Sequence, residues 1–583
     1  MSQSSVITAC PLDCYDACNV VATPTSLKGV SDSHTHGYLC PHLNHFNNYE
    51  FIQAPRLNGK EISMDEALRV LQERIAKVST PSQILHYRGS GNFGLMQEVS
   101  DHFFASHGAT LTEGSLCDGA GEAGILEGRG SNKLYSYDEI AKSEVIIVWG
   151  RNIHTTSSHL LPLLKDKTII VIDPVKTKIA EMAEHYIQIK PKGDLYLALL
   201  LSRFAIINGL EDEAYLEAFA SSYDDFYELT QSVRIKAILD SIDVTLGDIG
   251  KILDLIKNKK TMILTGVGIQ KVRNGDEVIQ AIDGFATIMG FHAKEGCGVN
   301  FLGSSKTGIV MPFKQKSSAK AVSKVNAEFG RFEVTFIQGA NPLNQMPDTN
   351  RVEASLEQCP FVVYFGLYEN ETSQAADLVI PAKSFLQKDD IRTSYGHNQL
   401  QEMPKLFDSE AGISEYALTS YLCNAFDIDL ESELSLLEHF QSFGEDNGEV
   451  CMVKGRQERP YDKGFDTDDG EYLFLEEYSS DTVDEAGLFL ITPKSETSLN
   501  SQFKRDDKVY LNTSHGYSAG ERLSLSSNNG SVELEVAIDE RLRDDCVLVY
   551  SGTAGVNRLT DSTMSYVGKS AAYQEHKVKV KKC

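Results

Sequence analysis

The sequence has 583 residues, of which 42% are hydrophobic, and its formal net charge is −27 at pH 7. The apolar fraction excludes a disordered chain, and the length indicates several domains or one elaborate domain. A strongly acidic surface repels nucleic acid and anionic membranes, so neither is expected as a partner. No twin arginine or apolar leader precedes the first cysteine, and no stretch reaches the roughly 18 apolar residues of a membrane span, so a cytoplasmic protein is expected.

Residues 1–54 are predicted to form short strands and turns around four cysteines, Cys10, Cys14, Cys18 and Cys40. Their spacing is C-x3-C-x3-C-x21-C. The total of eleven cysteines is odd and four of them are crowded at one end, which in a reducing compartment favours metal ligation over disulfides. Three cysteines close together in the sequence, with a fourth further along the chain, are typical of the ligands of a [4Fe–4S] cluster. A structural zinc, usually held by a pair of cysteines at each end, and unligated structural thiols are the alternatives.

A helix is predicted from about residue 63 to 78, with Ser63 as its N-cap and an apolar stripe that includes Leu68 and Leu71. Strand-like runs then alternate with helical ones: QILHY, EVIIVWG, KTIIVID, TMILTG, EVTFIQG, FVVYFG and DLVIPA. Near-continuous apolar runs are expected of parallel strands buried on both faces. They predict two doubly wound α/β units, the second inserted in the first. From about residue 490, short alternating strands and the turn signal SSNNGS predict a C-terminal β-barrel.

The loop RGSGNFG, at 88–94, follows the first of these strands. Gly89, Gly91 and Gly94 make the pattern G-x-G-x-x-G, with Glu113 about 20 residues further on, and this spacing resembles a dinucleotide-binding fingerprint. Glycines serve equally in any loop that passes close to a bulky cofactor. An NAD site is therefore one hypothesis and a lining loop is the other.

Cys117 is a lone cysteine in TEGSLCDGAGEAG, between a glycine turn and a run of small residues. Taken by itself it reads most simply as a buried core thiol. The alternative is a metal ligand or nucleophile beside a backbone that a large cofactor can approach. Asp118, next to it, is a candidate proton acceptor or a helix N-cap.

Three further strands end in residues typical of ligand loops. Trp149, Gly150 and Asn152 belong to VWGRN, Asp173 and Thr177 to VIDPVKT, and the third strand is followed by GANP at 339–342. Ligands bind outside the carboxyl ends of strands in open α/β sheets. The recurrence predicts two nucleotide-type sites.

Taken in order, these segments resemble the molybdenum and tungsten bis-pterin oxidoreductases, the dimethyl sulfoxide reductase superfamily, in its formate dehydrogenase and nitrate reductase branch. The motifs that carry the resemblance run over nearly the whole chain: CPLDCYDAC with GYLC, GSLCDGAGEAG, VIIVWGRN, IVIDPVKTKIAEMAEHYIQIKPKGDLYLALLL, IQGANPLNQMPD, YENETSQAADLVIPAKSFLQKDD and VNRLTD. Single motifs are moderately specific, but seven in order are strongly specific.

The resemblance implies a domain order. Residues 1–54 would form a [4Fe–4S] domain, 55–134 with 333–485 a discontinuous first pterin-dinucleotide domain, and 135–332 a second. Residues 486–583 would form a barrel that covers the cofactor. The implied cofactors are a [4Fe–4S] cluster on the four N-terminal cysteines, bis-molybdopterin guanine dinucleotide, and molybdenum or tungsten. Cys117 would be the protein ligand of that metal.

The resemblance also implies roles for other residues. The expected dinucleotide contacts are Trp149, Gly150, Asn152, Asp173, Thr177, Gly339, Asn341 and Asp377, with Asn557 from the barrel. His515 and Lys569 are expected to approach the cofactor from the barrel, and Asp118 and Glu122 are candidate proton carriers. A small molecule would be the substrate, and a ferredoxin or an iron–sulfur or flavin subunit would exchange electrons with the cluster.

Two departures from the family pattern stand out. The family usually carries Lys or Arg two residues after the fourth cysteine, and here that residue is His42. Formate dehydrogenases tend to carry histidine directly after the metal ligand, and here that residue is Asp118. The first puts cluster–pterin electron transfer in doubt, and the second argues against formate as the substrate.

Other functions stay open at this stage. A relative of the same fold could be a non-redox hydratase, or a metal-free electron-transfer or scaffold subunit, although Cys117 and the lack of further N-terminal cluster motifs argue against the latter. An NAD-dependent dehydrogenase would rest on the glycine loop alone. The substrate, the direction of reaction, the choice of molybdenum or tungsten and the oligomeric state do not follow from the sequence.

Overall fold

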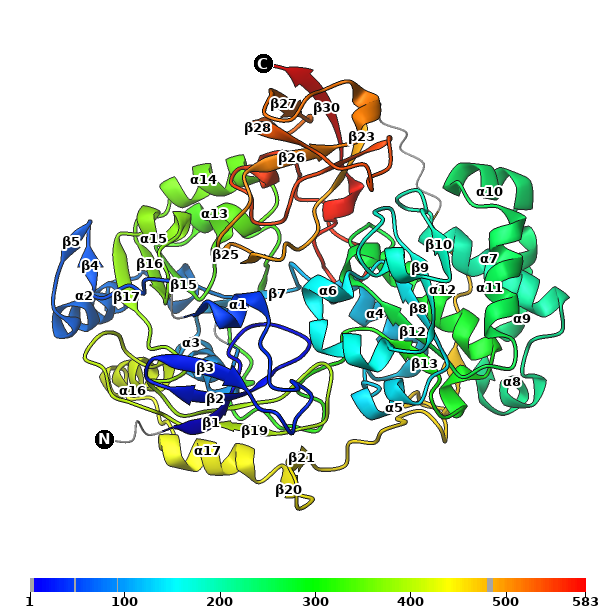
Figure 1. Ribbon diagram of the computed structural model, residues 1–583. Helices are drawn as coiled ribbons and strands as arrows, with labels where there is room; N and C mark the ends of the chain where they lie inside the picture. Colours follow the sequence, from blue (N-terminus) through cyan, green and yellow to red (C-terminus); the bar gives the residue numbers. More distant parts are fainter. Residues whose placement is uncertain (1–4, 47–48, 92, 480–485) are drawn as a thin grey trace.

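The computed structural model describes residues 5–46, 49–91, 93–479 and 486–583, which form a mixed α/β fold with a closed barrel near the C-terminus (Figure 1). The predicted boundary between residues 485 and 486 borders 480–485, which lie outside the described residues. No helix in the described ranges has the length and apolar character needed to cross a membrane.

The first large sheet has eight strands in the order β14-β7-β6-β15-β16-β17-β4-β5. Its central strands are parallel and confirm the predicted runs: β6 (Ile84–Arg88), β15 (Val334–Gln338), β16 (Val362–Gly366) and β17 (Leu378–Pro381). The flanking strands are β7 (Thr110–Glu113), β14 (Val322–Ser323), β4 (Arg56–Leu57) and β5 (Lys60–Glu61). Strand β14 joins this sheet although its residues fall within the range 135–332.

The second sheet has five parallel strands in the order β10-β9-β8-β12-β13. Their bounds are β8 (Val145–Trp149), β9 (Thr168–Ile172), β10 (His185–Ile187), β12 (Thr261–Thr265) and β13 (Gly298–Asn300). Every residue of β8 and β12 is buried, as the apolar runs predicted. The adjoining helices are α4 (Gly119–Arg129), α7 (Asp194–Ile207) and α12 (Gly275–Ile288), and α12 packs against both of the others.

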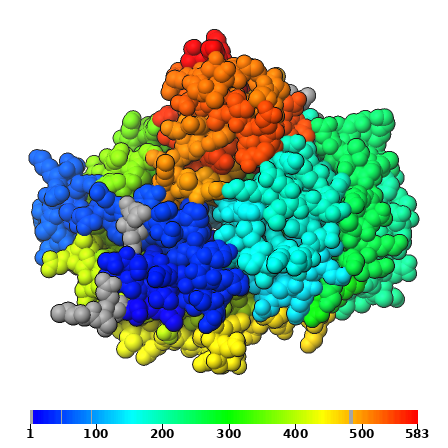
Figure 2. Space-filling view, viewed as in Figure 1, coloured from blue at the N-terminus to red at the C-terminus, as the bar shows by residue number. Residues whose placement is uncertain are grey.

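The N-terminal segment is a three-stranded antiparallel sheet of β1 (Val6–Ala9), β2 (Asn19–Thr23) and β3 (Ser26–Gly29). Cys10 follows β1 directly, Cys18 precedes β2, and the Cys10 N–H donates to the Cys18 carbonyl at 2.9 Å. Cys40 is the N-cap of the short helix α1 (Pro41–Asn44). On the face in Figure 2 this segment lies at the surface, below the barrel and beside the cyan part of the chain.

The barrel closes in the order β23-β29-β26-β28-β27-β30. Its strands are β23 (Leu488–Ile491), β26 (Lys508–Leu511), β27 (Arg522–Ser526), β28 (Ser531–Ile538), β29 (Cys546–Leu548) and β30 (Lys577–Lys582). Strands β27 and β28 form a hairpin, as the SSNNGS signal predicted, and the pair nearest the turn is Ser526 with Ser531. The sequence therefore predicted a barrel correctly, and the barrel lies above the two sheets in the view of Figure 1.

A buried ion pair ties α4 to α12 within the second unit. The Arg129 guanidinium donates to both carboxylate oxygens of Asp283 and to the Val299 carbonyl, and His292 lies 3.2 Å from the same carboxylate. Although burial acts to raise it, the pKa of Asp283 stays well below its usual value because Arg129 and His292 face it.

We expect Asp283→Asn to lower the free energy of unfolding by about 3–5 kcal/mol, because it leaves the Arg129 charge buried without its counter-ion. Urea unfolding followed by circular dichroism measures the change. The control is Asp240→Asn, which breaks an exposed ion pair with Lys236 and should cost under about 1 kcal/mol. Equal losses in the two variants would contradict the expectation.

Candidate functional site

A cavity of about 910 Å³ lies where the two large sheets, the N-terminal segment and the barrel meet. Residues from all four parts line it, among them Cys10, Gly339, Gly150 and Asn557. The wall is built from the carboxyl ends of parallel strands, because the residues that follow β6, β8, β9, β12 and β15 all face the cavity. Both sheets therefore present their ligand-binding edge to one shared space, as expected for open α/β sheets.

The G-x-G-x-x-G loop packs against the loop that follows β15. A Cβ atom on Gly89 or Gly91 would sit 2.5 or 2.6 Å from the Gly339 carbonyl oxygen, so no larger residue fits at either position. Gly89 and Gly91 line the cavity, and the Phe93 N–H donates to the Pro11 carbonyl of the cysteine segment at 2.8 Å. The loop thus joins the first sheet to the N-terminal cysteines.

The four N-terminal cysteines all line the cavity. Cys10 and Cys18 are buried, and Cys14 and Cys40 are partly exposed to the cavity. Burial raises the pKa of all four thiols, that of Cys10 to about 12. The negative charge of neighbouring thiolates contributes to the rise at Cys10, Cys14 and Cys18, and that of Asp16 contributes at Cys40. The thiolate form is therefore disfavoured at all four positions unless a positively charged group binds the sulfurs.

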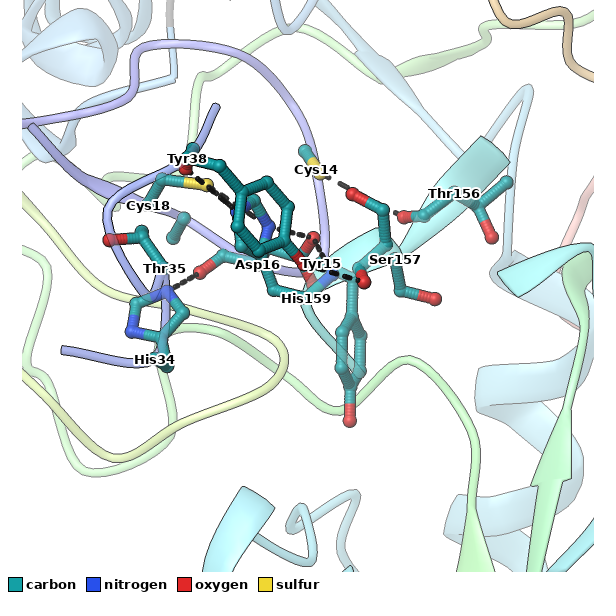
Figure 3. A network of polar contacts seen from close by, with 12 residues as sticks. Cys14, Tyr15, Asp16, Cys18, His34, Thr35, Tyr38, Thr156, Ser157 and His159 are labelled. Atoms are coloured by element: carbon teal, nitrogen blue, oxygen red, sulfur yellow. Dashed lines mark hydrogen bonds and ion pairs between the residues drawn. The ribbon is translucent and has the colours of Figure 1, made fainter. Parts of the chain in front are cut away.

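A polar network surrounds Cys18 and Cys14 (Figure 3). The carboxylate of Asp16, which is 2% exposed, accepts hydrogen bonds from the Tyr137 hydroxyl at 2.6 Å and from His159 Nδ1 at 2.9 Å. Cys14 Sγ lies 3.8 Å from the Thr156 carbonyl oxygen. The pKa of Asp16 is below its usual value even though burial acts to raise it, because His159 and Tyr137 donate to its charged form.

Cys117 lines the cavity from the turn between β7, a strand of the first sheet, and α4. Its N–H donates to Ser115 Oγ at 2.9 Å, and its carbonyl accepts from Gln270 Nε2 at 2.7 Å. Hydrogen bonds therefore fix both the N–H and the carbonyl of Cys117. Burial and the neighbouring Asp118 raise the pKa of the thiol to about 11, although Lys271 and Lys494 act to lower it. The thiol is thus fixed on a cavity wall, within reach of the positive charges of Lys271 and Lys494, and its role as a metal ligand stays a prediction.

Several lysines on the cavity wall escaped the sequence analysis, and three of them are Lys271, Lys324 and Lys494. Burial lowers the pKa of Lys324 and of Lys494 to about 8. Among the described residues none of the three has an ion-pair partner; Lys324 donates to the Arg88 carbonyl and Lys494 to Asn500 Oδ1. They come from three distant segments with no common motif, so only the fold reveals that they share a cavity. Their charges favour anionic groups in it.

Several polar side chains on the wall carry a buried atom that lacks a hydrogen-bond partner within the described part of the chain. Among these atoms are Arg151 Nη1, Asn152 Oδ1, Thr177 Oγ1 and Asn344 Oδ1. Buried polar atoms are nearly always paired in native proteins, and an unpaired one costs about 1–3 kcal/mol. These donors and acceptors therefore indicate a polar ligand that reaches both sheets.

The predicted contacts divide into two groups. Those that line the cavity are Gly150, Asn152, Asp173, Thr177, Gly339, Asn341 and Asn557. Trp149, Asp377 and His515 are not among the described residues that line it. The Trp149 side chain is fully buried and donates to Asp194 Oδ1 at 2.7 Å. Asp377 precedes β17, so it lies at the opposite edge of the sheet, where it accepts from the Val362 N–H.

The candidate proton carriers and the second barrel residue also lie off the cavity wall that the structure describes. Asp118 is the N-cap residue of α4 and accepts from Ser115 Oγ at 3.0 Å. Burial and the charge of Asp118 raise the pKa of Glu122 on the same helix. Lys569 is exposed and pairs with Glu113 at 2.6 Å. Their predicted roles stay predictions.

The cost of placing a carboxylate on this wall can be measured at Asp173. Burial raises its pKa from 3.8 to about 7, in spite of a hydrogen bond from the Val175 N–H. Between these two values the folded chain binds a proton that the unfolded chain has lost, so stability falls as pH rises through this window, by roughly 4 kcal/mol at most.

We expect Asp173→Asn to remove this slope, so that the variant gains stability over the wild type between pH 5 and pH 8. Urea unfolding of both proteins at several pH values checks the expectation. A stability difference that stays constant over that range would contradict it.

Comparisons with known proteins agree with this architecture. The family model for molybdopterin oxidoreductases matches residues 60–411, more than half of the chain. The probable oxidoreductase YyaE of Bacillus subtilis is 27% identical over 438 residues, which cover 69% of this chain and 66% of that protein. The assimilatory nitrate reductase catalytic subunit of the same species is 23% identical, with 66% of this chain and 62% of that protein covered.

Formate dehydrogenases are also among the relatives, as the motif order predicted. In fold, the chain is similar to the acetylene hydratase of Pelobacter acetylenicus, with a TM-score of 0.75 and 16% identity, over 99% of this chain and 100% of that one. The extent of the family match settles the classification: the chain belongs to the molybdopterin oxidoreductase family, a family of enzymes.

Proposed function

We propose that the chain is a molybdenum- or tungsten-dependent oxidoreductase that carries out a two-electron reaction on a small substrate, with a single [4Fe–4S] cluster as its electron relay. The observation that carries the proposal is that Cys117 and the four N-terminal cysteines face one cavity. Five sulfur donors from two distant segments would have no reason to converge there in a purely structural core.

The residues present fit a [4Fe–4S] cluster. Cys10, Cys14, Cys18 and Cys40 face the same end of the cavity, and iron would offset the mutual repulsion of their thiolates. We assign this cluster to a domain of residues 1–54.

The residues present also fit two pterin dinucleotides. The unpaired atoms of Arg151, Asn152, Thr177 and Asn344 supply hydrogen-bonding groups on both sheets, and Lys271 and Lys494 supply positive charge for anionic groups. We therefore propose residues 55–134 with 333–485, and residues 135–332, as the two dinucleotide domains, with the barrel of 486–583 as their cover.

Cys117 would hold molybdenum or tungsten, for which a soft thiolate is a suitable ligand. When bound, the metal supplies the two-electron chemistry. The chain contributes the surroundings: the positive charges of Lys271 and Lys494 act in favour of the Cys117 thiolate, and Ser115 and Gln270 fix its backbone. Asp118 and Glu122 remain our candidates for moving a proton near this point.

Lys494 supplies a positive charge that acts on His42, the residue that stands where the family usually carries Lys or Arg. His42 is buried in α1, and burial lowers the pKa of its imidazole; the positive charge of Lys494 acts in the same direction. The same Lys494 charge acts on Cys117 and Asp13. The charge that acts on both the cysteine segment and Cys117 is therefore supplied by Lys494, which follows the barrel strand β23, rather than by the residue two positions after Cys40.

Electrons would pass between the cluster and a separate protein, for which a ferredoxin or an iron–sulfur or flavin subunit is our expectation, and we expect the protein to work in the cytoplasm. A second candidate function is a non-redox hydration reaction, favoured by the fold likeness to acetylene hydratase. A metal-free electron-transfer subunit is less favoured, because Cys117 is retained on the cavity wall.

The test is a turnover assay of protein purified without oxygen, using a viologen dye as electron donor or acceptor and a panel of small oxyanions, sulfoxides, formate and acetylene. Turnover that requires the dye supports the proposal. Hydration of acetylene that proceeds without the dye would favour the hydratase, and iron without molybdenum or tungsten would favour the electron-transfer subunit.

A further inference from the structure

The Lys324 side chain reaches across the edge of the first sheet that faces the cavity. Lys324 directly follows β14, which pairs with β7 in the register Ser323 with Glu113. Its Nζ donates to the carbonyl of Arg88, the last residue of β6, at 2.9 Å. Because β7 lies between β14 and β6, the side chain crosses the carboxyl end of β7. The ammonium group therefore lies close to the turn that leads from β7 to Cys117.

The charged groups around Lys324 balance one another without it. The Arg88 guanidinium pairs with Asp101 at 2.9 Å and with Glu98 at 3.0 Å. Glu98 also pairs with Lys306. Two cations thus face two carboxylates, and no carboxylate among the described residues lies within ion-pair distance of Lys324 Nζ. The positive charge of Lys324 is therefore in excess on this part of the wall.

Burial makes this excess charge costly. Desolvation lowers the pKa of Lys324 to about 8, and the Arg88 charge acts in the same direction. The carboxylates of Asp101, Glu98 and Asp118 act in the opposite direction but do not restore the usual value. An ammonium group has three hydrogens to donate, and Lys324 uses one of them on the Arg88 carbonyl. The other two are left for a ligand in the cavity.

The hydroxyl of Tyr87 also lacks a partner at this place. Tyr87 precedes Arg88 in β6 and lines the cavity together with Lys324, whose Nζ lies 5.9 Å from the centre of the tyrosine ring. The tyrosine is 1% exposed, and its hydroxyl finds no hydrogen-bond partner in the described part of the chain. Burial raises the pKa of this hydroxyl, so it keeps its hydrogen and can donate. A buried phenol and a buried ammonium thus form a pair of donors that lack an acceptor.

We infer that Lys324 and Tyr87 form a subsite for a small oxyanion, and that such an anion is the substrate class of the enzyme. The inference rests on the proposed function, because it places the substrate close to the turn that carries Cys117. A positive charge and a hydroxyl donor match oxygen atoms that bear negative charge, and charge-assisted hydrogen bonds are the stronger kind. A neutral substrate would leave the buried charge unmatched. The phosphates of the dinucleotides are a second source of anionic oxygen, which the test separates from the substrate.

The test is isothermal titration calorimetry of the oxidised holoenzyme with nitrate, selenate and arsenate as separate probes. Without an electron donor these anions cannot be reduced, so the titration measures affinity alone. Lys324→Gln removes the charge, Lys324→Arg keeps a charge, and Tyr87→Phe removes only the hydroxyl. Lys316→Gln is the matched control, because this lysine is exposed and is not among the described residues that line the cavity.

For an anion that the wild type binds, we expect Lys324→Gln to raise the Kd at least about tenfold, because a charge-assisted hydrogen bond is lost. Tyr87→Phe should raise the Kd at least about threefold, because it loses one hydrogen bond to a charged group. Lys324→Arg should bind more tightly than Lys324→Gln, and Lys316→Gln should match the wild type. A smaller rise in Lys324→Gln or in Tyr87→Phe, or an equal loss in Lys324→Arg, would overturn the inference.

Metal analysis of the same samples separates the two sources of anionic oxygen. Molybdenum or tungsten should be equal in the wild type and in Lys324→Gln, and its loss in the variant would overturn the inference, because the charge would then serve the cofactor. If Lys324→Gln does not fold, Lys324→Met takes its place in both measurements. A wild type without either metal refutes the proposed function, whereas a wild type that holds the metal and binds none of the three anions refutes this inference alone.

Discussion

Cys117→Ala is expected to lower turnover by more than about 100-fold while leaving the iron content unchanged. Even partners that only orient a metal ligand are worth about 10- to 100-fold, so loss of the ligand itself should cost more. The iron is untouched because the four N-terminal cysteines lie on a separate segment of the cavity wall.

Turnover is measured with the viologen assay. X-ray absorption at the molybdenum or tungsten edge counts the sulfur atoms around the metal, and the variant should show one sulfur fewer than the wild type. Cys451→Ala is the matched control, since that thiol is also partly exposed but does not line the cavity among the described residues. Wild-type turnover in Cys117→Ala would show that this thiol only packs.

Cys14→Ala is expected to produce the second large effect, a loss of the [4Fe–4S] cluster. Iron should fall from about four atoms per chain to three or fewer, because a cubane cluster needs four protein ligands and no other cysteine among the described residues faces that end of the cavity. Molybdenum or tungsten should stay, since Cys14 lies on a different segment from Cys117.

Iron analysis and the electron paramagnetic resonance signal of the reduced protein measure the effect of Cys14→Ala. Cys423→Ala is its control, because Cys423 is buried in the helix α16 (Glu415–Ala425), within the core of the first sheet. Four irons retained in Cys14→Ala would contradict the assignment of this cysteine.

The elements of the fold could be predicted where local pattern and final burial agree. The run Val145–Trp149 is apolar at every position, and the strand is buried on both faces, so its sequence needs no tertiary information to be recognised. Ser63 likewise caps its helix, accepting from the Glu66 N–H as predicted. The barrel was predictable because its strands alternate and its hairpin turn has a local signal.

The site was only partly predictable, because strand ends can be recognised from sequence while side-chain directions cannot. Gly150 and Asp173 follow strands and line the cavity, whereas Trp149 is the last residue of its strand and points into the core. Asp377 precedes a strand rather than following one, which places it at the opposite edge of the sheet from the cavity. The edge a residue occupies depends on strand direction, which its own sequence does not reveal.

Contacts between segments that are far apart in the sequence could not be predicted from the sequence. Asp16 and His159 are 143 residues apart, and Lys271, Lys324 and Lys494 come from three different parts of the chain. No spacing rule connects such residues. Their buried charge and unpaired donors become visible only once the sheets and the barrel are placed around one cavity.

The most direct test of the central claim is metal analysis of the wild-type protein purified without oxygen, with iron, molybdenum, tungsten and zinc counted per chain. We predict about four irons together with one molybdenum or tungsten. Zinc in place of iron, or iron with neither molybdenum nor tungsten, would contradict the claim that the five cavity cysteines hold a cluster and a catalytic metal.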